Sequence, residues 1–210
     1  MKKLLFFLLI LFSFSLVCAH QPRYVMNQNN ILVNNPEISQ AFYAELQGES
    51  DYYSINSNKP FELYVNILAP ESGNTNFKVI ISKENETLES AIILNGENHS
   101  WNKFYEEFAG DTYLRGPEFE KNVSEGKYLI KVFNENNTGK YSLAIGKLEV
   151  FSIKDLFSLF RIKHDFFGKS YFAFFQGIIG KSILFLILVF ILIILIIYKI
   201  IKKKKRSRKK

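Results

Sequence analysis

The chain has 210 residues, 48% of them hydrophobic, and a formal net charge of +7. Residues 20–150 carry 18 acidic and 11 basic side chains, a net −7, whereas residues 151–210 carry 14 basic and 2 acidic ones, a net +12. Lys2 and Lys3 supply the remaining +2. A basic excess confined to the ends fits anionic lipid headgroups and excludes a nucleic-acid-binding surface in the central part.

The N-terminal residues have the anatomy of a signal peptide. Two lysines precede an apolar stretch over residues 4–11, and the small side chain of Ala19 stands just before a predicted cut at His20. A charged start, a short apolar segment and a small-residue exit are typical of secretory signals. We therefore predict that residues 1–19 are a signal peptide, with an uncleaved signal anchor as the alternative.

Cysteine usage agrees with export only in part. Cys18 is the only cysteine, and it is expected to leave with the signal. Exported domains often use disulfides, but about 130 residues bury an adequate core without them. A cysteine-free exported chain rich in Asn, Lys and Ile indicates a prokaryote of low GC content.

Residues 20–150 show the alternation of apolar and polar side chains that is typical of half-buried strands. The clearest runs are 38–46 and 61–68, and shorter ones follow at 76–82, 91–94, 127–133 and 140–145. Gly, Asn, Asp and Pro residues that favour turns separate them. Short strands at this spacing predict an all-β extracytoplasmic domain, an antiparallel β-sandwich of the jelly-roll kind.

Three segments of this domain carry a family resemblance. Asp51-Tyr-Tyr-Ser-Ile55, Glu125-Gly-Lys-Tyr-Leu-Ile-Lys-Val132 and Gly139-Lys-Tyr-Ser-Leu-Ala144 resemble, in order and spacing, three strands of the bacterial pre-peptidase C-terminal family. The resemblance covers residues 38–146. It implies a secreted binding or accessory module, sometimes stabilised by calcium, without catalysis.

The chain departs from that family in two places. Where members usually carry an Asp-rich hairpin, residues 76–95 hold only Glu84, Glu86 and Glu89, so none of the family's calcium ligands transfers. A longer insertion then follows at residues 101–121.

This insertion concentrates candidate metal ligands. Its carboxylates are Glu106, Glu107, Asp111, Glu118 and Glu120. Calcium prefers oxygen ligands of this kind, so calcium is the candidate ion, although the EF-hand spacing is absent and the pattern requires no cofactor. The alternative is a loop that exposes its acids to solvent.

The same insertion offers an aromatic platform. Trp101, Tyr105 and Tyr113 would suit a protein or glycan ligand outside the cell. The alternative is that these aromatic side chains pack over one end of the sandwich.

His20 is a second metal candidate. As the first residue after the predicted cut it would offer both its amine and its imidazole, and copper favours imidazole nitrogen. A second histidine would have to come from His99 or His164. The alternative is a solvated N-terminus.

We find no motif of catalysis. The exported part has no cysteine, no Gly-x-Ser-x-Gly and no His-Glu-x-x-His, which removes the usual nucleophile and metal signatures. The sequence therefore predicts a protein that is not an enzyme.

Residues 151–180 form an aromatic juxtamembrane segment. Ile153, Leu156, Phe157 and Phe160 fall near one helical face, which suits a helix lying in the membrane interface. The alternative is a short helix packed on the base of the sandwich.

Residues 181–201 predict a transmembrane helix. The uncharged run 182–198 would span roughly 25 Å, just enough for a bilayer core. Residues 202–210 form a polybasic tail, which marks the cytoplasmic side. The residues expected at the lipid headgroups are Lys181, Lys199, Lys202, Lys203, Lys204, Lys205 and Arg206.

Together these features predict a single-pass surface protein of the cell membrane, N-terminus outside, that presents a β-sandwich binding or scaffolding module. The alternatives are an accessory subunit of a membrane complex and an exported calcium- or copper-binding protein.

Overall fold

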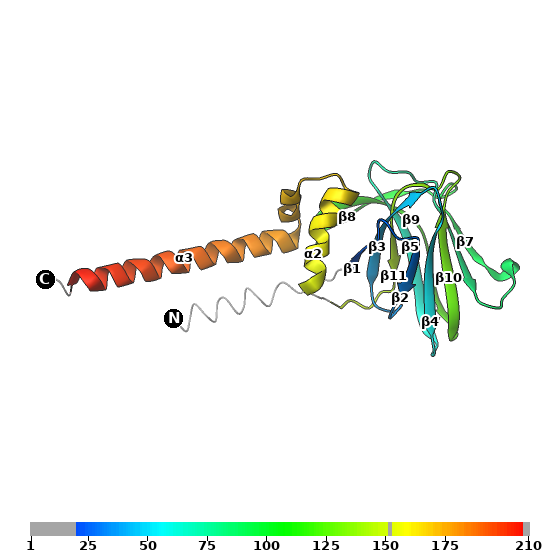
Figure 1. Cartoon of the computed structure of the whole chain (residues 1–210), viewed down its shortest axis with the longest axis horizontal. Helices are drawn as coiled ribbons and strands as arrows, with labels where there is room; N and C mark the ends of the chain where they lie inside the picture. Colours follow the sequence, from blue (N-terminus) through cyan, green and yellow to red (C-terminus); the bar gives the residue numbers. More distant parts are fainter. Residues whose placement is uncertain (1–19, 151–152, 208–210) are drawn as a thin grey trace.

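The structure is a computed structural model that describes residues 20–150 and 153–207. The predicted signal peptide and the last three residues of the tail lie outside the described residues. The described part is a β-sandwich followed by short helices and one long helix that projects away from it (Figure 1).

One sheet has six strands and the other has five. The larger sheet has the order β1 (Gln21–Tyr24), β3 (Gln40–Gln47), β11 (Thr138–Ile145), β5 (Phe61–Pro70), β9 (Asp111–Val123) and β8 (Asn102–Glu106). The smaller sheet has the order β2 (Asn30–Val33), β4 (Asp51–Ser57), β10 (Gly126–Phe133), β6 (Lys78–Lys83) and β7 (Ile92–Asn95), with a 3₁₀ turn, η1 (Leu88–Ser90), before β7. The predicted β-sandwich is confirmed.

The sheets are mixed, which differs from the purely antiparallel prediction. The edge strands β1 and β2 run parallel to β3 and β4, and the other pairs are antiparallel. Residues 21–33 gave no strand signal because both strands are short and β1 contains Pro22. Proline is tolerated in an edge strand because no neighbouring strand accepts a hydrogen bond on the outer side of that strand.

The core forms where the inner faces of the two sheets meet. Leu63, Val65 and Ile67 alternate along β5 and are fully buried, as are Ile130 and Val132 on β10. This is the burial pattern that period-two alternation predicts.

Two tyrosines of the strand motifs, Tyr53 and Tyr141, belong to a buried polar chain that links the two sheets. The hydroxyl groups of Tyr53 on β4 and Tyr141 on β11 lie 2.9 Å apart. Tyr141 also donates a hydrogen bond of 2.6 Å to the carboxylate of Asp51. Asp51, Tyr53 and Tyr141, which belong to two of the three motifs, therefore stabilise the core.

The C-terminal part has four elements. They are α2 (Ile153–Arg161), a π-helical turn η2 (Ile162–Phe166), a 3₁₀ segment η3 (Tyr171–Gln176) and α3 (Ile178–Ser207). In Figure 1, α2 lies across the end of the sandwich from which α3 leaves, and it runs crosswise to α3. Within α3, Ile178–Lys202 is long and apolar enough to span a membrane, and its most apolar 18 residues have a mean hydropathy of 3.3 and are not buried.

The structure supports the alternative, packing on the sandwich, for part of the juxtamembrane segment. We expected it to lie in the membrane interface, but Ile162 and Phe166 are 1% and 2% exposed and pack against the sandwich. Leu159 and Phe174 form a second buried cluster with the β8–β9 turn. The segment therefore closes one end of the domain, as the alternative proposed.

Candidate functional site

The site with the most buried polar groups joins the sandwich to the membrane helix. It consists of the β8–β9 turn (residues 106–111), η2 with Lys169 behind it, and the start of α3, and we call it the joint. Gly110 makes the turn, with a positive φ of 75°. The turn brings Glu106 opposite Asp111 in the pairing of β8 with β9.

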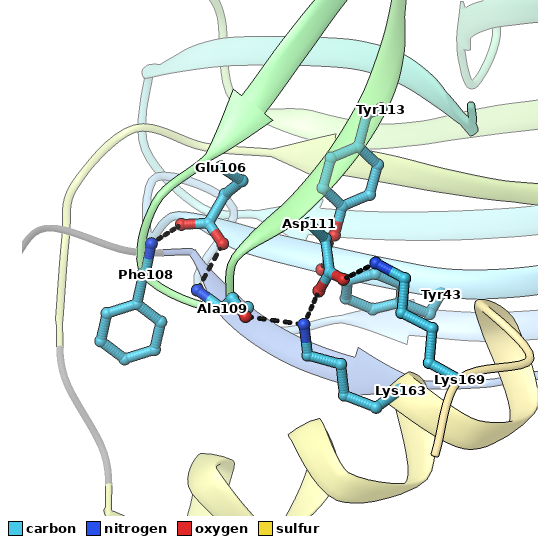
Figure 2. A network of polar contacts seen from close by, with 8 residues as sticks. All are labelled: Tyr43, Glu106, Phe108, Ala109, Asp111, Tyr113, Lys163 and Lys169. Atoms are coloured by element: carbon cyan, nitrogen blue, oxygen red, sulfur yellow. Dashed lines mark hydrogen bonds and ion pairs between the residues drawn. The ribbon is translucent and has the colours of Figure 1, made fainter. Parts of the chain in front are cut away.

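Asp111 is the centre of the joint (Figure 2). Its carboxylate, 1% exposed, lies 2.5 Å from the ammonium group of Lys163 and 3.0 Å from that of Lys169. Lys163 is also 1% exposed and donates a second hydrogen bond, of 2.6 Å, to the carbonyl oxygen of Ala109. Burial lowers the pKa of Lys163, and the hydrogen bond that Lys163 donates to Asp111 opposes that effect.

Glu106 organises the turn itself. Its two carboxylate oxygens accept hydrogen bonds of 2.9 Å and 2.7 Å from the backbone N–H groups of Phe108 and Ala109. Burial raises the pKa of Glu106, although these backbone donors lower it. The side chain thus acts as an internal cap that stabilises the turn, and the Ala109 carbonyl oxygen of this turn accepts the hydrogen bond from Lys163.

Aromatic side chains exclude water around the charges. The hydroxyl groups of Tyr43 and Tyr113 are 2.8 Å apart, and burial raises the pKa of both. Phe166 meets Tyr43 edge-on at 5.0 Å between ring centroids, and Phe167 meets Tyr113 at 5.3 Å. A low-polarity surround strengthens the ion pairs and makes an unpaired charge costly.

The membrane helix begins directly on the β8–β9 turn. The N–H groups of Ile178 and Ile179 donate to the carbonyl oxygens of Glu107 and Phe108, at 3.1 Å and 3.4 Å. The first N–H groups of a helix lack partners within it, and here the sandwich supplies them. A Cβ atom on Gly177 would lie 2.4 Å from the Phe108 carbonyl oxygen, so glycine permits this close approach.

A second contact holds the helical segment to β1. Tyr24 donates a 2.7 Å hydrogen bond to the Asp165 carboxylate, and the guanidinium of Arg161 lies 4.3 Å from the centre of the Tyr24 ring. Lys140 on β11 donates to the Asp165 carbonyl oxygen at 2.5 Å. The hydrogen bond from His164, and then that from Tyr24, lower the pKa of Asp165.

The five predicted calcium ligands do not meet at one point. Glu118 accepts a hydrogen bond from Tyr64, and Glu120 pairs with Lys147. Asp111 is occupied by two lysines. Among the described residues there is no group of three or more His, Cys, Asp or Glu side chains that could hold a metal ion.

The three predicted platform aromatics do not share a surface. Tyr113 is buried at the joint, 3% exposed, whereas Tyr105 is 54% exposed. Trp101 is half-buried; its N–H donates to the Gly96 carbonyl oxygen and its ring lies over Gly116. The alternative, packing against the sandwich, describes Trp101 and Tyr113.

The histidines proposed for copper have separate neighbours. His20 shares a hydrogen bond with Ser39, His99 meets the Trp101 ring edge-on, and His164 stacks on Tyr171 at 4.6 Å. The basic residues assigned to the headgroups, from Lys181 to Arg206, all fall within α3.

The sequence analysis missed Lys163 and Lys169. Lys163 was expected away from the apolar face of an interfacial helix, and Lys169 within an aromatic interfacial stretch. The signal that could have found them is that both lysines lie in a strongly aromatic stretch, which tends to be buried. A buried cation requires a carboxylate partner, so an acidic residue elsewhere in the chain was to be expected beside them. Asp111, weighed only as a metal ligand, was that partner.

A polar groove lies at the open edge between the sheets. It has a volume of 530 Å³ and lies between β1, β2 and α2. Amide side chains line much of it: Gln21, Gln28, Asn30, Asn34, Asn35 and Gln40. Sequence reasoning did not anticipate this groove.

No protein family model matches the chain, and no curated protein matches it. Among solved structures, the chain is similar to the pre-peptidase C-terminal domain of collagenase from Bacillus anthracis, with 12% identity, a TM-score of 0.35, and coverage of 60% of this chain and 95% of that one. It is also similar to CorA, a surface-associated copper-binding protein of Methylomicrobium album BG8, with 6% identity, a TM-score of 0.30, and coverage of 58% and 98%.

The first of these structures comes from the family that the three strand motifs resemble. The second also matches over nearly its whole length. At these identities and TM-scores, neither match carries information about a ligand or an activity of this chain.

Proposed function

We propose that the chain is a single-pass, membrane-anchored surface protein that presents its β-sandwich as a binding or scaffolding module in a fixed orientation. The observation that carries the proposal is the direct attachment of an exposed apolar helix, Ile178–Lys202, to the β8–β9 turn. An apolar surface of this length is stable in a bilayer and unfavourable in water. The buried ion pairs of the joint leave little freedom between the two parts.

The proposed orientation has the sandwich outside and the C-terminus in the cytoplasm. It is supported by the basic residues that follow the apolar span, because positive charge is retained on the cytoplasmic side. The proposed signal peptide at residues 1–19 would deliver the sandwich to the outside.

Membrane extraction and protease accessibility test this proposal together. The full chain should stay in the membrane pellet after an alkaline carbonate wash. A protease added to intact cells should degrade the sandwich, while an epitope tag after Lys210 should stay protected until the cells are opened. Release by carbonate, or a tag accessible in intact cells, would contradict the anchor or its orientation.

The polar groove between β1, β2 and α2 is the proposed ligand-facing part of the module. Its amide lining offers both donors and acceptors, which suits a polar ligand such as a glycan or an extended peptide. A glycan array probed with the full chain in nanodiscs tests this role, and Gln28→Ala with Asn34→Ala should reduce any binding found.

The second candidate is an accessory subunit of a membrane complex. It is favoured by the exposed aromatic side chains of α2 and η3, which would fit a neighbouring protein as well as lipid. Purification of the full chain in mild detergent should then recover a partner in fixed stoichiometry, whereas the leading proposal needs none.

A further inference from the structure

The two most exposed large hydrophobic side chains of the described residues lie just before the membrane helix. Phe172 is 80% exposed and Phe157 is 73% exposed, more than Phe190, which at 64% is the most exposed such side chain of α3. Tyr171 is 52% exposed. The most exposed large hydrophobic side chain of the sandwich, Ile93, is 63% exposed.

These aromatic residues belong to elements that are bound to each other. The Phe160 ring of α2 stacks on the Phe174 ring of η3, with 4.2 Å between centroids. Tyr171 stacks on His164 in the same way, at 4.6 Å. The exposed rings are therefore held on one rigid unit, so their exposure is a fixed property of the surface.

The exposed side of α2 points away from the sandwich. Phe157 and the buried Leu159 are two residues apart, which places them about 200° apart around a helix, on nearly opposite sides. Leu159 is 4% exposed and packs in the cluster below the β8–β9 turn. Since α2 lies across the end of the sandwich from which α3 leaves, its outward side faces the region that α3 enters (Figure 1).

We propose that Phe157, Tyr171 and Phe172 lie in the headgroup region of the same bilayer that α3 spans. This inference rests on the proposed membrane anchor. Phe172 stands six residues before Ile178, where the apolar span begins. Aromatic side chains concentrate at the membrane–water boundary, and a helix with one apolar side lies in the plane of that boundary.

The charges of this region suit phosphate headgroups. Arg161 and Lys181 are exposed at the ends of α2 and at the start of α3. Residues 153–181 contain five basic and two acidic residues, Asp155 and Asp165. The carboxylate of Asp165 is already engaged by Tyr24 and His164. One side of the juxtamembrane segment thus binds the sandwich and the other binds lipid, so that the domain rests on the membrane at a second point besides α3.

Nitroxide labels at single cysteines test the proposal in the full chain. Cys18 is the only cysteine, so Cys18→Ser gives a clean background for Phe157→Cys and Phe172→Cys, both at exposed positions that tolerate a label. Leu192→Cys in the middle of α3 reports insertion, and Leu129→Cys on the exposed side of β10 is the matched control on the sandwich. The labelled proteins are placed in nanodiscs of phosphatidylcholine and phosphatidylglycerol, and collisions with a water-soluble nickel chelate and with oxygen are measured by electron paramagnetic resonance.

We expect labels 157 and 172 to collide with the nickel chelate much less often than label 129. The ratio of oxygen to nickel collisions should place both labels at a shallower depth in the bilayer than label 192. If labels 157 and 172 collide with nickel as often as label 129 while label 192 is protected, the lipid contact is overturned, and the aromatic surface would be left for a protein partner. If label 192 is itself accessible to nickel, the proposed anchor fails and this inference fails with it.

Discussion

Asp51 and Asp111 are both buried aspartates, 3% and 1% exposed, but they occupy different kinds of surroundings. Asp51 lies in the sandwich core, and its carboxylate accepts a hydrogen bond from the neutral Tyr141. Asp111 lies at the joint and faces two ammonium groups, from Lys163 and Lys169.

This difference separates the stability of the domain from its attachment to the helix. The polar chain of Asp51, Tyr141 and Tyr53 uses residues of the sandwich alone, so it persists wherever the sandwich is folded. The ion pairs of Asp111 need a segment more than fifty residues later in the chain. The joint can therefore open without unfolding the core, and substitutions should affect the two regions independently.

The largest expected effect is that of Lys163→Met. Removal of one partner of a buried ion pair typically costs about 3–5 kcal/mol, and we expect the lower end because Lys169 remains beside Asp111. The loss should appear as faster hydrogen exchange at the amides of Gly110 and Ile178, with the exchange of core strands β5 and β10 unchanged.

Two further variants make this prediction specific. Lys163→Met combined with Asp111→Leu should recover much of the protection, because a buried pair replaced by apolar groups is often neutral. Lys103→Met removes an exposed partner of Glu71 and should leave exchange at the joint unchanged. Equal exchange in the wild type and Lys163→Met would show that the ion pair does not hold the joint.

The next effect concerns the core and depends on pH. Burial raises the pKa of Asp51 from 3.8 to about 6, although the hydrogen bond from Tyr141 lowers it. A carboxyl group whose pKa is raised by folding stabilises the fold at a pH below its pKa in the unfolded chain. This contribution is lost as the pH rises through its pKa in the folded chain. The difference corresponds to roughly 3 kcal/mol.

Asp51→Asn measures this contribution. The free energy of unfolding of the variant relative to the wild type should increase by roughly 3 kcal/mol as the pH rises from 4 to 7. The difference between Asp51→Asn and the wild type in the protection of the Ile178 amide should not vary with pH, because Asp51 lies outside the joint. A difference between variant and wild type that is constant with pH would mean that Asp51 ionises as freely as in an unfolded chain.

A smaller effect is expected from Gly177→Ala. The new Cβ atom would lie 2.4 Å from both the Ala109 carbonyl carbon and the Phe108 oxygen, which are backbone atoms that cannot rotate away. Overpacking of this kind costs about 1–3 kcal/mol. We expect the amides of Ile178 and Ile179 to lose protection, with Gln176→Ala at the exposed neighbouring position as the control. Unchanged protection in Gly177→Ala would rule out the close approach of α3 to the turn.

The smallest effect is that of Glu106→Gln. The amide has one acceptor oxygen where the carboxylate has two, so one of the N–H groups of Phe108 and Ala109 loses its partner. Loss of such a bond costs about 1 kcal/mol. Glu107→Gln is the matched control, since the side chain of Glu107 is exposed. If the amides of Phe108 and Ala109 are equally protected from hydrogen exchange in both variants, the turn is stable without the hydrogen bonds to Glu106.

The sequence predicts the sandwich well because its signals are local. Leu63, Val65 and Ile67 alternate with polar residues on β5, and both the strand and its buried side follow from that alternation. The two parallel edge strands escaped prediction because residues 21–24 and 30–33 are too short to show a period. Their positions are set by pairing with β3 and β4, which is a long-range property.

The joint could not be predicted because its signals lie in different parts of the chain. Asp111 and Lys163 each have a plausible local interpretation, as a metal ligand and as a charge on a solvated helix face. Only the packing of η2 on the sandwich brings their side chains to 2.5 Å. From the aromatic content of residues 151–180, the interface was favoured and packing on the sandwich was the alternative. Both kinds of side chain are present, because Leu159 and Phe166 are buried in the domain whereas Phe157 and Phe172 are exposed.

The central claim is that the joint holds the sandwich at a fixed orientation on the membrane helix. It is tested most directly by the distance between nitroxide labels at Leu129→Cys on β10 and Leu192→Cys on α3, measured by double electron–electron resonance on the full chain in nanodiscs. The account predicts one narrow distance distribution in the wild-type background and a broad one after Lys163→Met. A broad distribution in the wild-type background would contradict it, because the sandwich would then be attached to α3 by a flexible linker.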